Sequence, residues 1–282
     1  AQADAAGNVC FYTITTAHLI IDINGVTDTG ITPIPNERTD TRGVPKPPPS
    51  SDFTYLYESS QPEAPYTLGG KRYLGWDPCS PITYAVNNKA GATPAQRAVL
   101  DQAILGVEQA TGFDFQYVGE ATGSLATSSI DANTPNGQAE AVFGFSNATF
   151  TPILGGSVIG IGGAGSGSGN NVELLRGKLY IVKGGYAIAD LDDVLTNDEL
   201  LGTMLHEIAH MVGLDHVSVQ TEIMWDTLPN PPLTAFGVGD RNGLYNIGQP
   251  QCTAGFGGLT QAPRGAPTSL SIDMWRADTA EH

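Results

Sequence analysis

Basic side chains are scarce in this sequence of 282 residues. It carries 13 lysines and arginines against 29 aspartates and glutamates, which gives a formal net charge of −16 at pH 7. Such a charge repels the phosphates of nucleic acids and of anionic lipid surfaces, so we expect neither as a partner. The sequence also lacks an apolar run of about 18 residues, so we expect no membrane span.

Cysteine is rare as well, since Cys10, Cys79 and Cys252 are the whole set. Three cysteines leave at least one without a partner in the chain, and the sequence does not choose among the three possible pairings. The apolar share of 40% is nevertheless enough for a real core, and the length suffices for one sizeable domain with a smaller part beside it.

The most informative stretch runs from His206 to His216 and reads HExxHxxGxxH. Helical positions four apart lie on one face, one turn apart, so His206 and His210 can bind the same ion. Gly213 can adopt the conformation that ends a helix, which allows the chain to double back and bring His216 to that ion. Three imidazoles and a water are typical of catalytic zinc, and Glu207 beside the metal can take a proton from that water.

The motif has two alternative interpretations. The three histidines could be ordinary core or surface residues that happen to have this spacing. Alternatively, the zinc could be structural, but Glu207 would then have no reason to be an acid. His18 is better explained as a packed or surface residue, because no second ligand lies at a suitable spacing.

The motif resembles that of the metzincin metalloendopeptidases, in which the same histidine pattern is followed by a methionine turn beneath the metal. Met224, eight residues after His216, stands where that turn would be, and this short connection is similar to that of the matrixin branch. Val217 fits none of the residues usual after the third histidine, and no tyrosine closely follows Met224 as in astacins. The resemblance implies the family and leaves the branch open.

The resemblance also implies an α+β, metzincin-like catalytic domain. Its parts would be a twisted, mostly parallel sheet of about five strands with an edge strand lining the cleft, two long helices and a C-terminal helix. Capping boxes, Thr93 with Gln96 and Thr196 with Glu199, predict the starts of the two long helices. Residue patterns predict strands over 82–86, 113–118, 140–145 and 178–182.

Metzincins bind the substrate backbone along an edge strand that precedes the zinc helix. The segment in the corresponding order, where a peptide could pair as an extra strand, is Ser157, Val158, Ile159, Gly160 and Ile161. The glycines at this density in 155–169 are equally consistent with a flexible loop.

The resemblance further implies that residues 227–238 wall the pocket for the substrate residue after the scissile bond. Leu228, Leu233 and Phe236 would make that wall apolar. The prolines in this segment are equally consistent with a plain surface loop.

Asp190, Asp192 and Asp193 crowd the loop before the zinc helix. A Ca²⁺ ion is conceivable here but not favoured, because the regular spacing of oxygen ligands in a known calcium loop is absent. The predicted metal content is one catalytic Zn²⁺ ion.

Cys79 and Cys252 fall near the two ends of the expected catalytic domain, so we predict that they form a disulfide. Such a bond indicates an oxidising compartment, and we therefore expect a secreted, extracellular or cell-surface protein. Cys10 then has no assigned partner.

Four regions are predicted along the chain. Residues 9–43 resemble the last part of a β-rich repeat of secreted actinobacterial proteins, so 1–45 is interpreted as a partial module and the chain as a piece of something longer. Residues 46–70 are predicted as a proline-rich linker. Residues 71–253 are the metzincin-like zinc protease domain, and 254–282 are a polar tail.

These features together predict a zinc-dependent endopeptidase that hydrolyses protein or peptide substrates by metal-activated water, with Glu207 as general base. Two alternatives stay open. One is a cell-surface or adhesive protein with a vestigial or self-processing zinc site, and the other is an amidase that acts on cell-wall peptides. The sequence does not determine the substrate preference or the oligomeric state.

Overall fold

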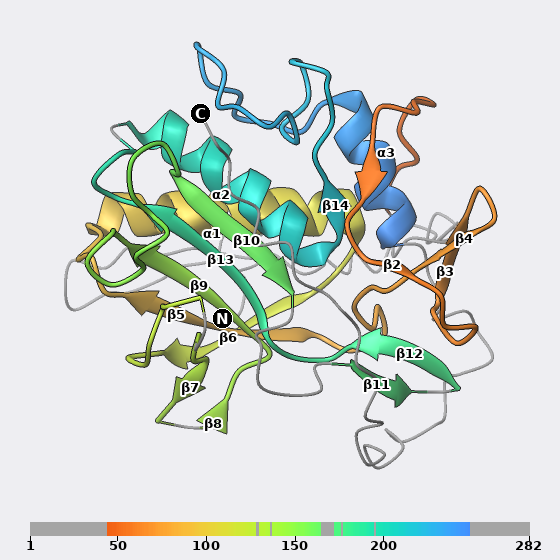
Figure 1. Cartoon of the computed structure of the whole chain (residues 1–282), viewed down its shortest axis with the longest axis horizontal. Coiled ribbons are helices and arrows are strands. Elements are labelled where there is room, and N and C mark those ends of the chain that lie inside the picture. The colour runs from red at the N-terminus through yellow and green to blue at the C-terminus, as the bar shows by residue number, and fades with distance from the viewer. Residues whose placement is uncertain are drawn as a thin grey trace, which may run out of the picture. The chain divides into compact units, whose positions relative to one another are not determined.

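Five strands form the central sheet of the computed structural model, in the order β10, β13, β9, β5, β6 (Figure 1). Four strands are parallel and the edge strand β10 is antiparallel; their bounds are β5 (Ile82–Asn88), β6 (Phe115–Glu120), β9 (Ala141–Ser146), β10 (Gly160–Ala164) and β13 (Gly185–Asp190). The predicted α+β class and the mostly parallel, five-stranded sheet are thereby confirmed. Strand β13, which leads to the motif helix, is one that the residue patterns did not reveal.

The structure describes residues 44–127, 130–135, 137–164, 172–175, 177–194 and 196–248. All of them belong to the unit Arg38–His282, while a second unit, Ala1–Glu37, lies outside the described residues. The predicted β-rich module up to residue 43, the polar tail 254–282, Cys10 and Cys252 also lie outside. The assignments made for them stay predictions.

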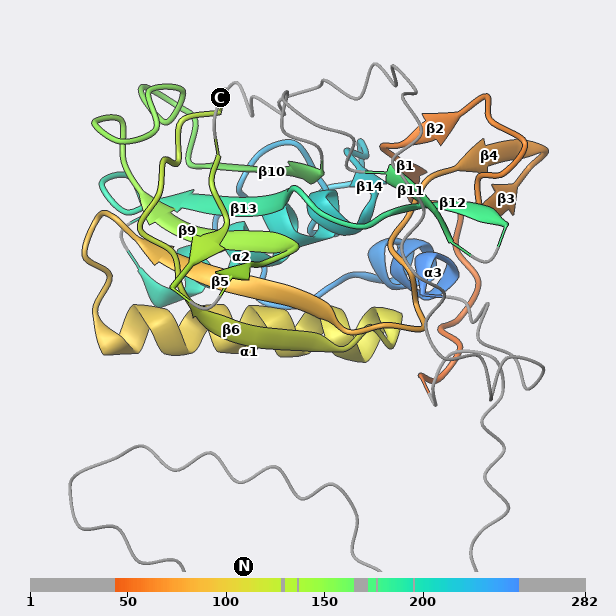
Figure 2. The same ribbon diagram turned by 90° about the horizontal axis from the view of Figure 1, so that it is seen from below.

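Three helices accompany the sheet in the described part of the chain: α1 (Pro94–Thr111), α2 (Asn197–Val212) and α3 (Val238–Ile247). Both predicted capping boxes form, since Thr93 and Thr196 each exchange hydrogen bonds with the residue three positions on. These bonds satisfy backbone N–H groups that the first helical turn leaves without partners, which fixes where each helix begins. Helix α2 packs against α1, β10 and β13 (Figure 2).

The main hydrophobic core lies between the helices and the sheet. Helix α2 contributes a stripe of four buried side chains at helical spacing, Leu201, Leu205, Ile208 and Val212. Each fully buried side chain of this size stabilises the fold by about 1.5–3 kcal/mol. The helix that carries the motif is therefore held by packing along its whole length.

Residues 46–70 are not the spacer that the sequence predicts. The segment forms β1 (Thr54–Tyr55), β2 (Glu58–Ser59) and β3 (Tyr66–Leu68); β1 pairs with β14 (Leu214–Asp215), and β2 and β3 flank β4 (Lys71–Tyr73). Its buried Tyr57 and its backbone pairing with a distant segment explain the difference, because proline content reports local stiffness and not tertiary contacts.

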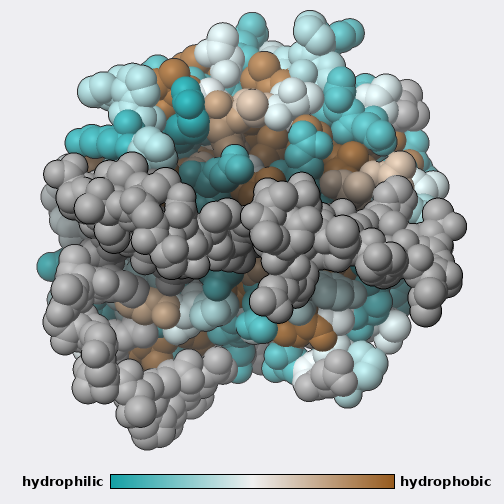
Figure 3. Space-filling model, turned by 180° about the vertical axis from the view of Figure 1, so that it is seen from behind, coloured by the Kyte–Doolittle hydropathy of each residue, from teal (hydrophilic) through white to brown (hydrophobic). Residues whose placement is uncertain are grey.

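Two short hairpins complete the described strands: β7 (Asn133–Thr134) with β8 (Gly137–Gln138), and β11 (Val172–Leu175) with β12 (Lys178–Ile181). The predicted strand 178–182 thus lies in a hairpin outside the central sheet. On the face shown in Figure 3, hydrophilic side chains interrupt the exposed hydrophobic ones. No helix among the described residues is long and apolar enough to cross a membrane.

Candidate metal centre

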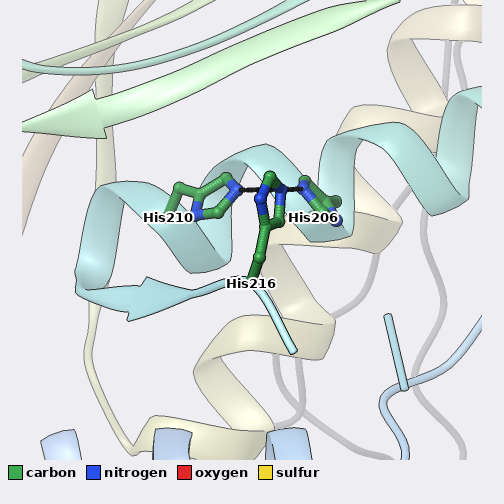
Figure 4. Close-up of side chains that lie close together, drawn as sticks. All are labelled: His206, His210 and His216. Carbon is green, nitrogen blue, oxygen red and sulfur yellow. Dashed lines mark hydrogen bonds between the residues drawn. The ribbon is translucent and has the colours of Figure 1, made fainter. Parts of the chain in front are cut away.

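Three imidazole nitrogens converge at the C-terminal end of α2 (Figure 4). The Nε2 atom of His206 lies 2.9 Å from Nε2 of His210 and 3.0 Å from Nε2 of His216, and the third distance is 3.3 Å. Gly213 ends the helix with φ of 127°, and β14 then leads the chain back to His216. The helix spacing and the turn thus bring the predicted ligands together.

The opposite nitrogens of two rings are held by backbone carbonyls. The Nδ1–H of His206 donates to Ile223 O at 2.7 Å, and that of His210 donates to Leu214 O at 2.8 Å. These bonds select the tautomer in which Nε2 carries a lone pair. Two lone pairs facing each other at 2.9 Å repel unless a cation lies between them. The three side chains therefore fit a metal ion.

The donor set indicates which ions suit the site. Three imidazole nitrogens at about 2.0–2.1 Å from a tetrahedral zinc ion would be about 3.3 Å apart. The observed separations of 2.9 to 3.3 Å are close to this value. Imidazole also suits copper, iron and nickel, so the geometry agrees with zinc without selecting it alone. Within the described ranges, these histidines are the only group of His, Cys, Asp or Glu side chains placed to hold an ion.

The side chain of Glu207 extends from α2 toward the edge strand β10, and only 4% of the residue's surface is exposed. A Cβ atom on Gly160 would lie 2.5 Å from Oε1 of Glu207, and one on Gly162 would lie 2.2 Å from the Glu207 carbonyl oxygen. Real Cβ atoms do not approach other atoms so closely, so a side chain at Gly160 would displace the Glu207 side chain and one at Gly162 would displace the α2 backbone. These two glycines therefore allow α2 to approach β10 closely.

The predicted substrate segment only partly coincides with the edge strand. Strand β10 begins at Gly160, so Gly160 and Ile161 lie in it, while Ser157, Val158 and Ile159 precede it. Ile159 still contributes to the site, because its side chain lines a pocket beside the histidines. Ile161 is fully buried. The role of these five residues in substrate binding stays a prediction.

Met224 lies in a buried turn that also orients one of the three histidines that could hold a metal ion. Its side chain is 1% exposed, and its carbonyl oxygen accepts the N–H of Val217 at 2.9 Å. The preceding residue, Ile223, supplies the carbonyl that holds His206. The turn therefore connects directly to the metal centre through the backbone next to Met224.

Asp240 on α3 fixes this turn, and sequence analysis did not single it out. Its carboxylate accepts the N–H groups of Ile223 at 2.5 Å, Met224 at 3.3 Å and Gly237 at 3.0 Å. Burial and the nearby Glu222 raise the pKa of Asp240 and the three N–H groups lower it, with a net rise to about 6. Sequence analysis could not find this role, because the carboxylate binds a backbone N–H group 17 residues earlier and no local motif marks such a contact.

A pocket opens next to the histidines and Glu207. Its lining includes Ile159, Thr203, Trp225, Leu228 and Leu233. Gly202 allows the Leu233 carbonyl to approach α2, because a Cβ there would lie 2.7 Å from that oxygen. Leu228 and Leu233 are where the resemblance places them, whereas Phe236 lines a different hollow, beside Pro45 and α1.

The last turn of α2 is capped by two side chains from an earlier segment, which sequence analysis also missed. The Tyr57 hydroxyl donates to His210 O at 3.0 Å, and Trp76 Nε1 donates to Met211 O at 2.9 Å. Carbonyls in the last helical turn have no partner within the helix, so these bonds satisfy them. Neither residue lies in a motif.

The three carboxylates of the acidic loop before α2 do not converge on a common point where they could hold an ion. Asp190 is buried at the end of β13 and accepts the N–H of Asp192 at 2.9 Å, while Asp192 and Asp193 are exposed. Burial raises the pKa of Asp190, and the Asp192 N–H opposes this shift. Asp190 thus has a structural role as a turn-forming side chain.

Cys79 is disulfide-bonded, and no other cysteine is among the described residues. Its N–H donates to Asp77 Oδ1 at 3.0 Å. The predicted partner, Cys252, lies outside the described residues, so the pairing of Cys79 with Cys252 stays a prediction.

Comparison with known proteins assigns no family. No family model matches the sequence, and no curated protein matches it. One of the solved structures that the chain resembles is that of myroilysin, with 13% sequence identity and a TM-score of 0.27. The match covers 49% of this chain and 44% of the myroilysin chain, so it spans less than half of either. A TM-score of this size assigns neither fold nor activity, and the site is interpreted from its own geometry.

Proposed function

We propose that this chain is a zinc-dependent endopeptidase of the metzincin type. The observation that carries the proposal is the convergence of three Nε2 atoms within 2.9–3.3 Å, two of them with their Nδ1 atoms bound to carbonyls. Glu207, adjacent to His206 in the sequence, lines the same pocket as His206. The histidine set, the acid and the adjoining pocket together support hydrolysis of a peptide bond.

His206, His210 and His216 would hold the metal, which when bound supplies a Lewis acid that lowers the pKa of water to about 7. The Glu207 carboxylate accepts the proton of the attacking water and delivers it to the leaving amine nitrogen. Its burial between α2 and β10 restricts its rotamers, so the acid and base roles are performed from one position.

A peptide substrate is supported by the geometry of β10. Among the described strands, β10 lies at the end of the sheet. The N–H of Ala164 points away from β13, since it donates to the Tyr57 hydroxyl. Strand residues alternate in direction, so the N–H and C=O groups of Gly160 and Gly162 point to the same open side. An extended peptide can pair there, with an apolar side chain entering the pocket lined by Leu228 and Leu233.

The test combines metal content with cleavage. Purified protein is analysed for bound zinc and then incubated with an unfolded protein, with a peptide library and with peptidoglycan fragments, each with and without a chelator. We expect about one zinc ion per chain and chelator-sensitive cleavage of the protein and peptides. Cleavage of peptidoglycan fragments alone would replace the endopeptidase by an amidase. Zinc binding without any hydrolysis would contradict the enzymatic proposal.

We also propose that the protein is secreted or displayed at a cell surface. The disulfide state of Cys79 supports this location, because structural disulfides persist mainly in oxidising compartments. Fractionation of the source cells, followed by detection of the chain in the medium or on the surface, is the direct measurement. Recovery from the cytosol alone would contradict it.

A further inference from the structure

Residues 54–57, here called the N-terminal strap, run alongside the turn of the metal motif. Thr54 pairs with Asp215 and Tyr55 with Leu214 in the β1–β14 ladder. The next residue, Leu56, donates its N–H to Gly213 O at 2.9 Å. Three consecutive strap residues thus bind the three residues that precede the ligand His216.

Tyr57 continues this contact on the other side of the turn. Its hydroxyl donates to His210 O at 3.0 Å and accepts the N–H of Ala164, the last residue of β10. One buried hydroxyl thereby joins the edge strand to the last turn of α2. The Tyr57 ring also lies against the motif glycine, since a Cβ on Gly213 would be 3.6 Å from Tyr57 Cδ2.

The carbonyl that Tyr57 binds belongs to a metal ligand. His210 O also accepts the N–H of Gly213 at 3.0 Å, and the His210 ring donates to Leu214 O at 2.8 Å. The orientation of the His210 ring therefore depends on where Leu214 lies relative to the end of the helix. Tyr57 holds the helix end, and Tyr55 holds Leu214.

Trp76, which forms an isolated bridge with Ile181, reinforces the same turn. Its Nε1–H donates to Met211 O at 2.9 Å, one residue after the carbonyl that Tyr57 binds. Its side chain is 1% exposed, and a Cβ on Gly185 would lie 2.6 Å from its ring. The contact is therefore locked by packing against β13.

We infer that Tyr57 and Trp76 are positioning residues of the metal centre, and that the N-terminal strap is part of it. The inference rests on the proposed function, because it concerns the metal that His206, His210 and His216 would hold. By fixing the last carbonyls of α2, the two side chains set the angle between the His210 and His216 rings. Outer partners that orient metal ligands change metal affinity by about 10–100-fold when they are removed.

The test measures zinc affinity in Tyr57→Phe, which removes the hydroxyl and keeps the ring. Tyr117→Phe is the control, since it also removes a tyrosine hydroxyl that donates one hydrogen bond, to Glu120 Oε1 at 2.6 Å, and that bond lies within β6 and does not involve α2. Each protein is stripped of metal and titrated with Zn²⁺ against a chromophoric chelator. The unfolding temperature of the zinc-free form is measured alongside, because a merely structural role would lower that temperature and leave the affinity unchanged.

We expect the zinc Kd of Tyr57→Phe to rise about tenfold or more, with that of Tyr117→Phe unchanged. Equal affinities in wild type and Tyr57→Phe would overturn the inference alone. Failure of the wild type to bind zinc would overturn both it and the proposed function. If Tyr57→Phe does not fold, Trp76→Phe provides the second measurement: a weaker zinc affinity supports the positioning role, and an unchanged one overturns it.

Discussion

A Cβ atom on Gly160 would lie 2.5 Å from Oε1 of Glu207. The absence of a side chain at Gly160, the first residue of the edge strand, therefore leaves space for the carboxylate of the proposed general base. Thr203, one helical turn before Glu207 on the same face of α2, would have its Cγ2 atom 2.8 Å from the same Cβ position. The strand and the helix therefore approach each other as closely as the absence of a side chain allows. Addition of a single methyl group at Gly160 therefore tests whether activity depends on the position of Glu207.

Gly160→Ala is expected to displace the Glu207 carboxylate and to destabilise the fold by about 1–3 kcal/mol, as overpacking does. The kcat for peptide hydrolysis should fall, because the displaced carboxylate no longer meets the attacking water in the right geometry. Gly155→Ala is the control, because a Cβ there would make only ordinary contacts at 3.7 and 3.8 Å. Urea unfolding and steady-state kinetics of the two variants give the comparison. Similar kcat values in both would show that Gly160 does not limit the position of the base.

Glu207→Gln is expected to fold and to bind zinc, because glutamine has the same shape and Glu207 is not a ligand. Loss of a general base lowers the rate by about 10²–10⁴-fold. Metal content and peptide cleavage are measured on the same preparation. Full activity in the variant would refute the role assigned to Glu207, as would loss of the metal with loss of activity.

Removal of the metal is expected to lower the stability of the protein. Nε2 atoms as close as 2.9 Å repel each other without a cation, and a ligand present at 100 times its Kd stabilises the folded state by about 2.7 kcal/mol. Thermal unfolding with a chelator, and again after zinc is restored, measures the difference. A melting temperature that does not respond to chelator or zinc would argue against a metal at the three histidines.

Asp240→Asn is expected to loosen the turn that holds His206, because an amide cannot accept all three N–H groups that the carboxylate accepts. Removal of partners from buried donors costs about 1–3 kcal/mol. The variant should therefore unfold more easily and bind zinc more weakly. Asp114→Asn, at an exposed position, is the control and should do neither.

The same variant has a predicted pH dependence. The pKa of Asp240 rises from 3.8 to about 6 on folding, so between these values the folded chain binds more protons than the unfolded chain. Stability contributed by this group therefore falls as the pH rises through that window. The free energy of unfolding of Asp240→Asn should therefore fall further below that of the wild type near pH 4 than near pH 7. Denaturant unfolding at both pH values checks the sign, and an equal deficit would show that Asp240 does not titrate there.

Leu228→Ala is expected to enlarge the pocket beside the histidines and to shift substrate preference toward larger apolar side chains after the scissile bond. One methylene in such a pocket changes kcat/KM by about 10–200-fold. A peptide series that varies only this residue, compared between wild type and variant, gives the measurement. Phe236→Ala is the control, because Phe236 lines another hollow. An unchanged preference in Leu228→Ala would remove the pocket from substrate selection.

Local sequence determined the parts of this protein that depend on spacing along one segment. His206 and His210 share a helical face because they are four residues apart, and the capping box at Thr196 fixed where their helix begins. These predictions needed only the geometry of a helix.

Tertiary structure decided what depends on distant contacts. Tyr57 binds His210 O across 153 positions, although the segment around it has the composition of a linker. The role of Asp240 was likewise not predictable from local sequence, since its carboxylate binds backbone N–H groups of another segment. A sequence pattern records the side chains that one element presents, whereas these contacts depend on which backbone groups the fold brings within hydrogen-bonding distance.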